Sequence, residues 1–143
     1  MKSSRFFSNI IDSISDIEKT YEKCVEIATD VNTKLGPGHS EAVYEAAMMN
    51  GLYDARIPCR RQVPYLQRIN GYTLNIGTVD LEVNHDIIIE LKAGHDKIKE
   101  EFQTQLKRYL RCKKSETTHD GTTIACVFLF RRDGKLHTWR AAD

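Results

Sequence analysis

Three residues in the middle of the chain, Asp80, Glu90 and Lys92, combine types and spacing that can do chemistry. Glu90 and Lys92 follow three successive isoleucines, Ile87–Ile89, in a run that predicts a buried strand. Residues i and i+2 of a strand project from one face, so the carboxylate and the ammonium should lie side by side. Charged groups at the end of an apolar run are costly to bury without a partner or a purpose. This pattern, with Asp80 in a second apolar run, favours a site for metal-dependent phosphodiester hydrolysis.

The same spacing predicts how the acids meet. A two-residue turn between predicted strands at 78–83 and 86–92 would make these strands antiparallel neighbours. In that register Asp80 lies nearly opposite Ile89, one residue from Glu90 along the pairing. Both carboxylates are therefore expected to converge on one ion. The alternative interpretation is an ion pair at a strand end, with Asp80 exposed at a sheet edge.

The chemistry expected of this group is that of a hard divalent cation. Carboxylate oxygens suit Mg²⁺ or Mn²⁺, which bind through one or two carboxylates plus waters and phosphate oxygens. Lys92, on the same face as Glu90, could orient or help deprotonate an attacking water, or neutralise charge at phosphorus. We therefore expect Mg²⁺, or Mn²⁺ in its place, as the cofactor.

Apolar periodicity predicts three helices around these strands. Residues recurring at intervals of three, four or seven predict a first amphipathic helix from about residue 12 to Leu35, which Gly36-Pro37-Gly38 ends. A second helix is expected from Ser40, as the N-cap, to about residue 55. A third is expected over about residues 96–112.

Alternating and continuous apolar runs predict the strands. The continuous run at 123–130 is the most apolar of the chain and predicts burial on both faces. The order of two helices, three or four strands, one helix and two strands favours a mixed central sheet flanked by helices, in the α/β (α+β) class, over an alternating doubly wound fold. The expected strands are 62–68, 72–76, 78–83, 86–92, 123–130 and 136–139.

Two further polar residues are expected to face inward. Glu41 falls in the first turn of the second helix, on the edge of the face formed by Tyr44 and Met48. Gln105 comes seven residues after Ile98, close to two full turns, so it points along the apolar stripe of the third helix.

Composition places the chain among ordinary globular proteins. It has 143 residues, of which 41% are hydrophobic and 29% charged, and a formal net charge of +1. We expect one domain over residues 1–143, with residues 1–11 as a loose lead-in. Four scattered cysteines without a CxxC pair predict reduced thiols and argue against a zinc ribbon. No signal peptide or membrane segment is recognisable, so we expect an intracellular protein of the cytoplasm or nucleus.

Basic residues gather at the end of the third predicted helix. Lys107, Arg108 and Arg111 cluster there, and Arg61 belongs to a second candidate patch. Such residues can neutralise backbone phosphates, which predicts contact with nucleic acid. The alternative is a solvated face whose cations complement the C-terminal end of the helix dipole.

Together these motifs resemble the GxxExxY proteins, a branch of the PD-(D/E)XK nuclease superfamily. The resemblance covers roughly residues 15–140 and depends on the order of its elements more than on the common E-x-K tripeptide. The motifs are Gly38-x-x-Glu41-x-x-Tyr44, Arg61-Gln62-Val63-Pro64, Asp80, Glu90-Leu91-Lys92-Ala93 and Gln105-Leu106-Lys107-Arg108-Tyr109.

The resemblance implies a restriction-endonuclease-like core and assigns roles around one site. Glu41 would bind a second metal ion or orient a ligand water. Lys92 would be the catalytic base or charge stabiliser, and Gln105 would position a phosphate or the lysine. The implied metal ligands are Asp80, Glu90 and the backbone carbonyl of Leu91.

The expected function is Mg²⁺-dependent hydrolysis of phosphodiester bonds in nucleic acid, with DNA favoured over RNA. The first alternative is a catalytically silent module of the nuclease fold that binds nucleic acid or assembles a complex. A third candidate is a structural protein with no nucleic-acid role. Oligomeric state is left open, with a homodimer or a place in a larger complex as the candidates, and no membrane partner is expected.

Overall fold

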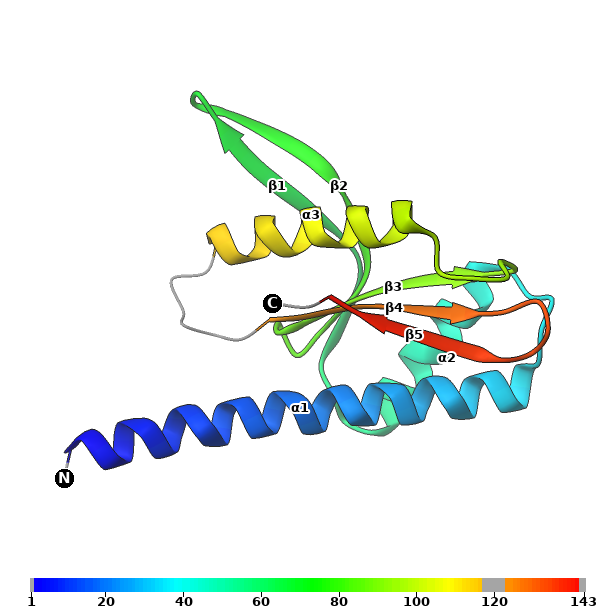
Figure 1. Cartoon of the computed structure of the whole chain (residues 1–143), viewed down its shortest axis with the longest axis horizontal. Coiled ribbons are helices and arrows are strands. Elements are labelled where there is room, and N and C mark those ends of the chain that lie inside the picture. The colour runs from blue at the N-terminus through cyan, green and yellow to red at the C-terminus, as the bar shows by residue number, and fades with distance from the viewer. Residues whose placement is uncertain (1, 117–122, 142–143) are drawn as a thin grey trace.

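The computed structural model describes residues 2–116 and 123–141, with side chains for residues 16–113 and 123–141. The described strands form one five-stranded sheet in the order β1-β2-β3-β4-β5, in which β3 and β4 pair in parallel and the other neighbours are antiparallel (Figure 1). This mixed sheet with flanking helices confirms the predicted α+β class. The elements are α1 (Lys2–Leu35), α2 (Glu41–Asp54), β1 (Cys59–Ile69), β2 (Tyr72–Val83), β3 (Ile87–Ala93), α3 (Glu100–Glu116), β4 (Ile124–Phe130) and β5 (Leu136–Arg140).

Helices cover both faces of the sheet. On one face α1 packs against β4 and β5, and α2 packs against β1 and β3. On the other face α3 packs against β1, β2 and β4 (Figure 1). α3 also connects β3 to β4, because parallel neighbours need a crossover and cannot be joined by a tight turn. The sequence predicts this crossover helix in the same place.

β4 is the most deeply buried strand of the sheet. All seven of its residues are buried, which confirms the predicted burial on both faces. At its end the ring of Phe130 stacks on Tyr44 of α2, with centroids 4.2 Å apart. The Tyr44 hydroxyl donates a hydrogen bond of 2.6 Å to the Gly36 carbonyl, so the loop after α1 is tied to the core.

Helix α1 is longer than predicted. It begins at Lys2 and continues through residues 2–11, which the sequence predicts as a loose lead-in (Figure 1). No Gly or Pro precedes Gly36, so nothing in this segment interrupts the helical hydrogen bonding once it has formed. Despite this length, no helix of the described residues is apolar enough over a sufficient span to cross a membrane.

β2 is one strand where the sequence predicts two. The expected break near Gly77 is a β-bulge instead, because Tyr65 pairs with Gly77 and Leu66 pairs with Asn75, so the register shifts there. A bulge takes up one extra residue without ending the pairing, and glycine in a strand interior often marks one. The hairpin of β1 and β2 is therefore continuous from Cys59 to Val83.

The turn between β2 and β3 also differs from the prediction. It contains three residues, Asn84–Asp86, and both Asn84 and His85 have positive φ, 51° and 64°. The longer turn moves the register by one residue, so Leu81 pairs with Ile89. Continued one position beyond the paired residues, this register puts Asp80 opposite Glu90, where the two-residue turn would put Asp80 opposite Ile89. Residues directly opposite each other in an antiparallel pair share a face.

Helix α3 begins later than predicted, at Glu100 instead of near residue 96. The Lys99 carbonyl accepts hydrogen bonds from the backbone N–H groups of Phe102 and Gln103, which marks the first helical turn. Ile98 therefore lies in the loop before the helix. β1 begins earlier than predicted, at Cys59 instead of residue 62.

Gly77 allows α3 to approach the hairpin closely. Its φ of 146° lies in a region that residues with a side chain rarely adopt. A Cβ at this position would also collide with the hydroxyl and ring of Tyr109 on α3. Tyr109 in turn packs edge-on against Tyr65 of β1, with ring centroids 5.8 Å apart. The contact between helix and hairpin thus depends on the missing side chain at Gly77.

We expect Gly77→Ala to lower the free energy of unfolding by about 2–4 kcal/mol, because it adds both backbone strain and a collision with Tyr109. Gly71→Ala is the matched control. Gly71 also has positive φ, 82°, but a Cβ there would meet no other atom within 4 Å. It should cost about 1 kcal/mol from backbone strain alone. Urea denaturation measures both, and equal losses would show that the Tyr109 contact contributes nothing.

Candidate active site

The carboxylates of Asp80 and Glu90 are locked to each other's strand. The backbone N–H of Asp80 donates a hydrogen bond of 3.1 Å to Glu90 Oε1. The backbone N–H of Leu91 donates one of 2.8 Å to Asp80 Oδ2. Because backbone donors hold both groups, neither carboxylate can swing away without breaking a hydrogen bond. The structure therefore brings together the two acids that the sequence singles out, and we call them the acid pair.

The acid pair carries more negative charge than its surroundings accommodate. Glu90 is only 3% exposed. Burial and, after it, the negative charge of Asp80 together raise the pKa of Glu90 to about 8, against the opposing effects of the Asp80 backbone hydrogen bond and the Lys92 charge. A site of this kind favours the addition of positive charge, either a proton or a cation.

The acid pair fits a divalent cation of the Mg²⁺ type. It supplies hard oxygen atoms from two adjacent strands, and Leu91 adds a backbone carbonyl next to Glu90 in the chain. Within residues 16–113 and 123–141, no three or more His, Cys, Asp or Glu side chains gather into a metal-binding group. An ion held by two carboxylates would therefore keep several water ligands, which is the usual state of protein-bound Mg²⁺.

A third acid, Glu45 of α2, is connected to the acid pair through Gln62 of β1. Gln62 Nε2 donates hydrogen bonds to Glu45 Oε2 at 2.8 Å and to Asp80 Oδ1 at 3.2 Å. Arg61 Nε donates to the other oxygen of Glu45 at 2.9 Å. Glu45 is buried, so these contacts satisfy a carboxylate that would otherwise be costly to desolvate. Through Gln62, the network holds Asp80 Oδ1, whereas Asp80 Oδ2 accepts the hydrogen bond from Leu91.

Gln62 reaches both acids because of its unusual backbone. Its φ is 49°, in the left-handed region, although it lies within β1 between two residues that pair normally with β2. A non-glycine residue in this region stores strain, and such outliers concentrate at functional sites. The positive φ is the structural observation that marks Gln62 as part of the candidate site.

Sequence reasoning missed Glu45 and Gln62 as site residues. Gln62 stands in one of the quoted motifs without a role, and the sequence predicts an inner face of α2 formed by Tyr44 and Met48. One signal could have found Glu45, since it precedes buried Met48 by three residues and therefore shares its face.

Glu41 lies one helical turn before Glu45 and on the same side of α2. It stands in the first turn of the helix, as predicted, but its side chain is exposed and not inward-facing. The physical reason is its position as the first residue of the helix, where a carboxylate can stay in solvent and still interact favourably with the helix dipole. The structure brings Glu45, and not Glu41, into the network around Asp80.

Lys92 and Gln105 line a common open pocket, and Lys92 connects it to the acid pair because it follows Glu90 by two residues on the same face of β3. The Nζ atom of Lys92 lies 4.7 Å from the ring centroid of Phe102, which holds the ammonium at the pocket wall. Gln105 Nε2 donates a hydrogen bond of 3.0 Å to the Tyr109 hydroxyl. The pocket has a volume of about 610 Å³ and is lined by Lys92, Glu100, Glu101, Phe102, Thr104, Gln105 and Arg108.

The four predicted nucleic-acid contacts divide between different surfaces. Arg108 lines the Lys92 pocket, and Arg111 and Arg108 together line a neighbouring hollow. Lys107 lies on another side of α3, with its Nζ 5.9 Å from the centroid of the Trp139 ring on β5. Arg61 is paired with Glu45 while most of its side chain stays exposed. Of the four, Arg108 is thus the one that lines the pocket, and Arg111 lies next to it.

The raised pKa of Glu90 predicts that the metal-free protein loses stability as pH rises. The ordinary pKa of a glutamate is 4.5, and that of Glu90 in the folded protein is about 8. Between these two pH values, the folded state keeps a proton on Glu90 that the unfolded state has released. The free energy of unfolding should therefore fall as pH rises across this window, by on the order of 3–5 kcal/mol in total. In Glu90→Gln this loss should disappear, as urea denaturation in EDTA between about pH 5 and pH 9 would measure.

Glu22→Gln, an exposed substitution on α1, is the control and should follow the wild-type curve. Parallel curves for wild type and Glu90→Gln would contradict the prediction. At the upper end of the window, added Mn²⁺ should restore stability to wild type but far less to Glu90→Gln, because the cation replaces the missing proton.

The comparisons with known proteins agree with this geometry. The sequence model of the PD-(D/E)XK nuclease superfamily matches residues 18–119, which include the acid pair, Lys92 and Gln105. No curated protein and no solved structure gives a significant match. The narrower GxxExxY assignment stays a prediction, whereas the expected restriction-endonuclease-like fold is confirmed. The chain belongs to the PD-(D/E)XK nuclease superfamily, and its function is of the nuclease type.

Proposed function

We propose that the protein hydrolyses phosphodiester bonds of nucleic acid, DNA in preference to RNA, at a divalent cation held by Asp80 and Glu90. The observation that carries this proposal is the acid pair, fixed by reciprocal backbone hydrogen bonds beside a pocket that contains Lys92 and Gln105. PD-(D/E)XK nucleases generally use divalent metals, and the elevated pKa of Glu90 supports a site prepared for positive charge.

The residues that would hold the ion are Asp80, Glu90 and the carbonyl of Leu91. When bound there, Mg²⁺ or Mn²⁺ would supply charge to a phosphate oxygen and acidify a ligand water. The acid pair would orient that water, because its carboxylates are fixed and can accept the water's hydrogen bonds. Burial of Glu90 strengthens each of these electrostatic interactions by excluding bulk solvent.

Lys92 would stabilise the charge that develops on the phosphoryl group or assist removal of the water's proton. Its ammonium faces a pocket large enough for a phosphate and part of a nucleotide, and Phe102 limits its freedom. Gln105, held by Tyr109, would position the phosphate with its amide. Preorganised donors of this kind act without reorganising during the reaction.

Acids on α2 would act at the margin of the site. Glu45 would act through Gln62, which holds Asp80 in the orientation that a ligand needs. Glu41, one turn away, would hold a second ion or a ligand water on the exposed side. Arg108 and Arg111 would bind phosphates that flank the pocket, with Lys107 and Arg61 as more distant contacts.

Cleavage of single-stranded, duplex and branched DNA and RNA in Mg²⁺ or Mn²⁺ tests the catalytic proposal. We expect Lys92→Ala to reduce the rate about 10²–10³-fold, because one preorganised charge is lost at the reacting phosphate. Lys34→Ala, an exposed lysine paired with Asp30 on α1, should keep the wild-type rate. Absence of metal-dependent cleavage from every substrate, together with metal-independent binding, would instead identify a silent nucleic-acid-binding module.

Glu45→Gln and Glu41→Gln separate the two acids of α2. Glu45→Gln should weaken Mn²⁺ binding about 10–100-fold, because groups that orient a metal ligand have effects of this size. Glu41→Gln should change the affinity less, since its carboxylate is exposed and one turn further from Asp80. Isothermal titration of Mn²⁺ measures both. A larger effect at Glu41 would show that the acid serving the site lies in the first turn of α2.

A further inference from the structure

The β1–β2 hairpin extends far beyond the rest of the sheet. β2 pairs with β3 only over Leu81–Val83, so the outer part of the hairpin has no third described strand beside it. Figure 1 shows it projecting past α3 as a two-stranded arm. We call residues 66–75 the arm. A two-stranded ribbon is only marginally stable alone. We therefore expect a binding partner to cover an exposed hairpin of this length.

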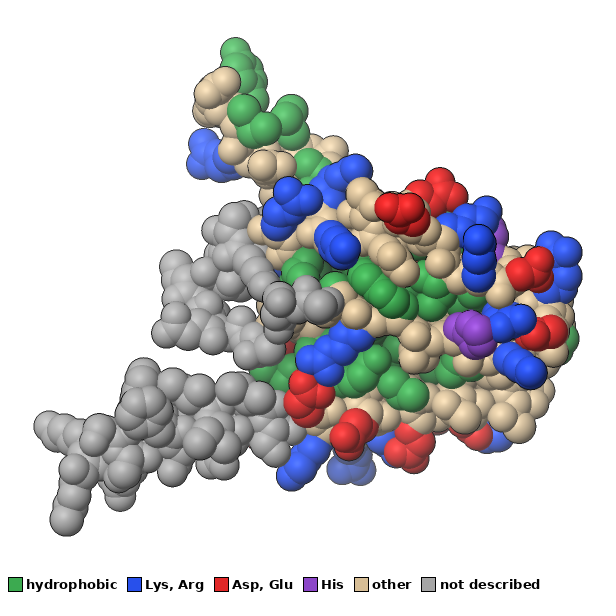
Figure 2. Space-filling model, viewed as in Figure 1, with side chains coloured by type: hydrophobic (Ala, Val, Ile, Leu, Met, Phe, Trp, Pro, Cys, Tyr) green, Lys and Arg blue, Asp and Glu red, His purple; other side chains and the backbone are tan. Residues whose placement is uncertain are grey.

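Exposed apolar side chains concentrate on the arm. Tyr72 is 74% exposed, and Leu66, Ile69 and Leu74 are each 43–46% exposed. These are four of the six exposed large apolar side chains among the described residues, and Figure 2 shows hydrophobic side chains gathered at the tip of the arm. Single exposed apolar residues are ordinary, whereas a cluster on a projecting element marks an interaction surface.

Most of this cluster lies on one face of the arm. Ile69 pairs with Tyr72 and Gln67 pairs with Leu74, and directly paired residues share a face. Two residues before Gln67, Tyr65 points from the same face of β1 and packs against α3. The face formed by Gln67, Ile69, Tyr72 and Leu74 therefore continues the side of the sheet that carries α3 and the Lys92 pocket. We call it the arm face.

Charge favours nucleic acid as the occupant of the arm face. The arm contains one arginine, exposed Arg68, and no Asp or Glu. Gln67 of the arm face lines a hollow with Arg108 and Arg111 of α3. Arg108 also lines the Lys92 pocket, so basic residues lead from the candidate site to the arm. The acids of that pocket, Glu100 and Glu101, lie at the opposite end of α3.

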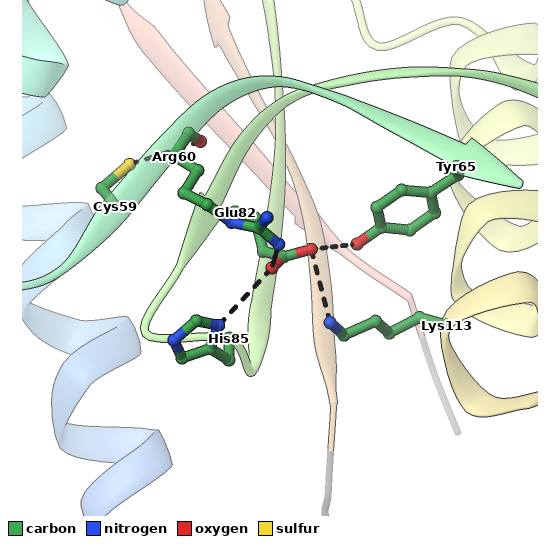
Figure 3. Close-up of polar contacts among 6 residues, drawn as sticks. All are labelled: Cys59, Arg60, Tyr65, Glu82, His85 and Lys113. Carbon is green, nitrogen blue, oxygen red and sulfur yellow. Dashed lines mark hydrogen bonds and ion pairs between the residues drawn. The ribbon is translucent and has the colours of Figure 1, made fainter. Parts of the chain in front are cut away.

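The base of the arm is held by a buried carboxylate. Glu82 is 2% exposed and accepts hydrogen bonds from Arg60 and from the Tyr65 hydroxyl, the latter at 2.8 Å. Lys113 at the end of α3 lies 3.4 Å from the same carboxylate, and His85 lies 3.8 Å away (Figure 3). These contacts join β1, β2, α3 and the β2–β3 turn at one point. The hairpin is thus anchored to the rest of the fold at Glu82, while the tip of the arm stays exposed.

We propose that the arm face stacks against unpaired bases of a nucleic-acid strand whose phosphates lie along Arg108 and Arg111. This inference rests on the proposed function and specifies its substrate as nucleic acid with a single-stranded region. Aromatic and apolar side chains stack on any base, and nearby arginines neutralise the backbone. A second copy of the chain is the alternative occupant of the arm face, and sedimentation distinguishes it below.

Binding of fluorescein-labelled oligothymidine and of a duplex of equal length, measured by anisotropy in EDTA, tests this proposal without requiring cleavage. Tyr72→Ala should weaken single-strand binding about tenfold and duplex binding less than twofold. Tyr72→Trp should retain single-strand binding because it preserves the stacking surface. Tyr53→Ala removes a similarly exposed tyrosine, 83% exposed, from α2 and should bind both probes as wild type does.

The outcomes separate this inference from the proposed function. If wild type cleaves or binds nucleic acid while Tyr72→Ala behaves like wild type, the arm proposal alone is overturned. Equal losses on single strand and duplex would also overturn it, because base stacking requires unpaired bases. No binding by wild type to either probe at low salt would overturn both proposals. Sedimentation showing a wild-type dimer and a Tyr72→Ala monomer would identify the arm as an interface between copies and overturn base stacking.

Discussion

The structure around the candidate site depends on one constraint: two carboxylates, half-buried Asp80 and almost fully buried Glu90, are held close together. Like charges in such surroundings repel strongly, so the fold must supply both the geometry and the stability that keep them there. The geometry comes from reciprocal backbone hydrogen bonds between β2 and β3. Stability comes from apolar packing around the same strands, where Ile87, Ile88 and Ile89 are fully buried. A tightly packed sheet can hold an unfavourable pair that a loop could not.

The sequence predicts the parts of this arrangement that are encoded locally. The isoleucine run predicts β3, and the alternation of side chains in a strand places Glu90 beside Lys92. The continuous apolar run of β4 predicts a strand buried on both faces. Features that depend on backbone exceptions were not predictable in the same way. The register between Asp80 and Glu90 is set by left-handed residues in a three-residue turn, which alternation does not encode. The link from Glu45 through Gln62 joins positions 17 residues apart and requires a positive φ inside a strand.

Helix α3 divides its side chains between the core, the pocket and the surface. Gln105 and Arg108 are three residues apart and line the same pocket, whereas Lys107 points towards Trp139. Tyr109 faces the hairpin, where it fills the space left by Gly77 and accepts the hydrogen bond from Gln105. One tyrosine therefore couples the position of a pocket residue to the packing of the arm's base. Through Tyr109, the hairpin and the pocket residue Gln105 are therefore positioned relative to each other.

Two buried glutamates on neighbouring strands show why the acid pair differs from structural polar contacts. For Glu82, burial would raise the pKa, but the hydrogen bonds from Arg60 and Tyr65 and the charges of Lys113 and Arg60 outweigh it, and the pKa is lowered. For Glu90, burial and the charge of Asp80 prevail, and the pKa rises to about 8. Both side chains are almost fully buried, so burial alone does not distinguish them. The positive partners of Glu82 lie within the chain. For Glu90, the Asp80 N–H and the Lys92 charge compensate only part of the negative charge of the acid pair. An incompletely compensated carboxylate pair beside an open pocket is the arrangement expected of a site that acts on a ligand.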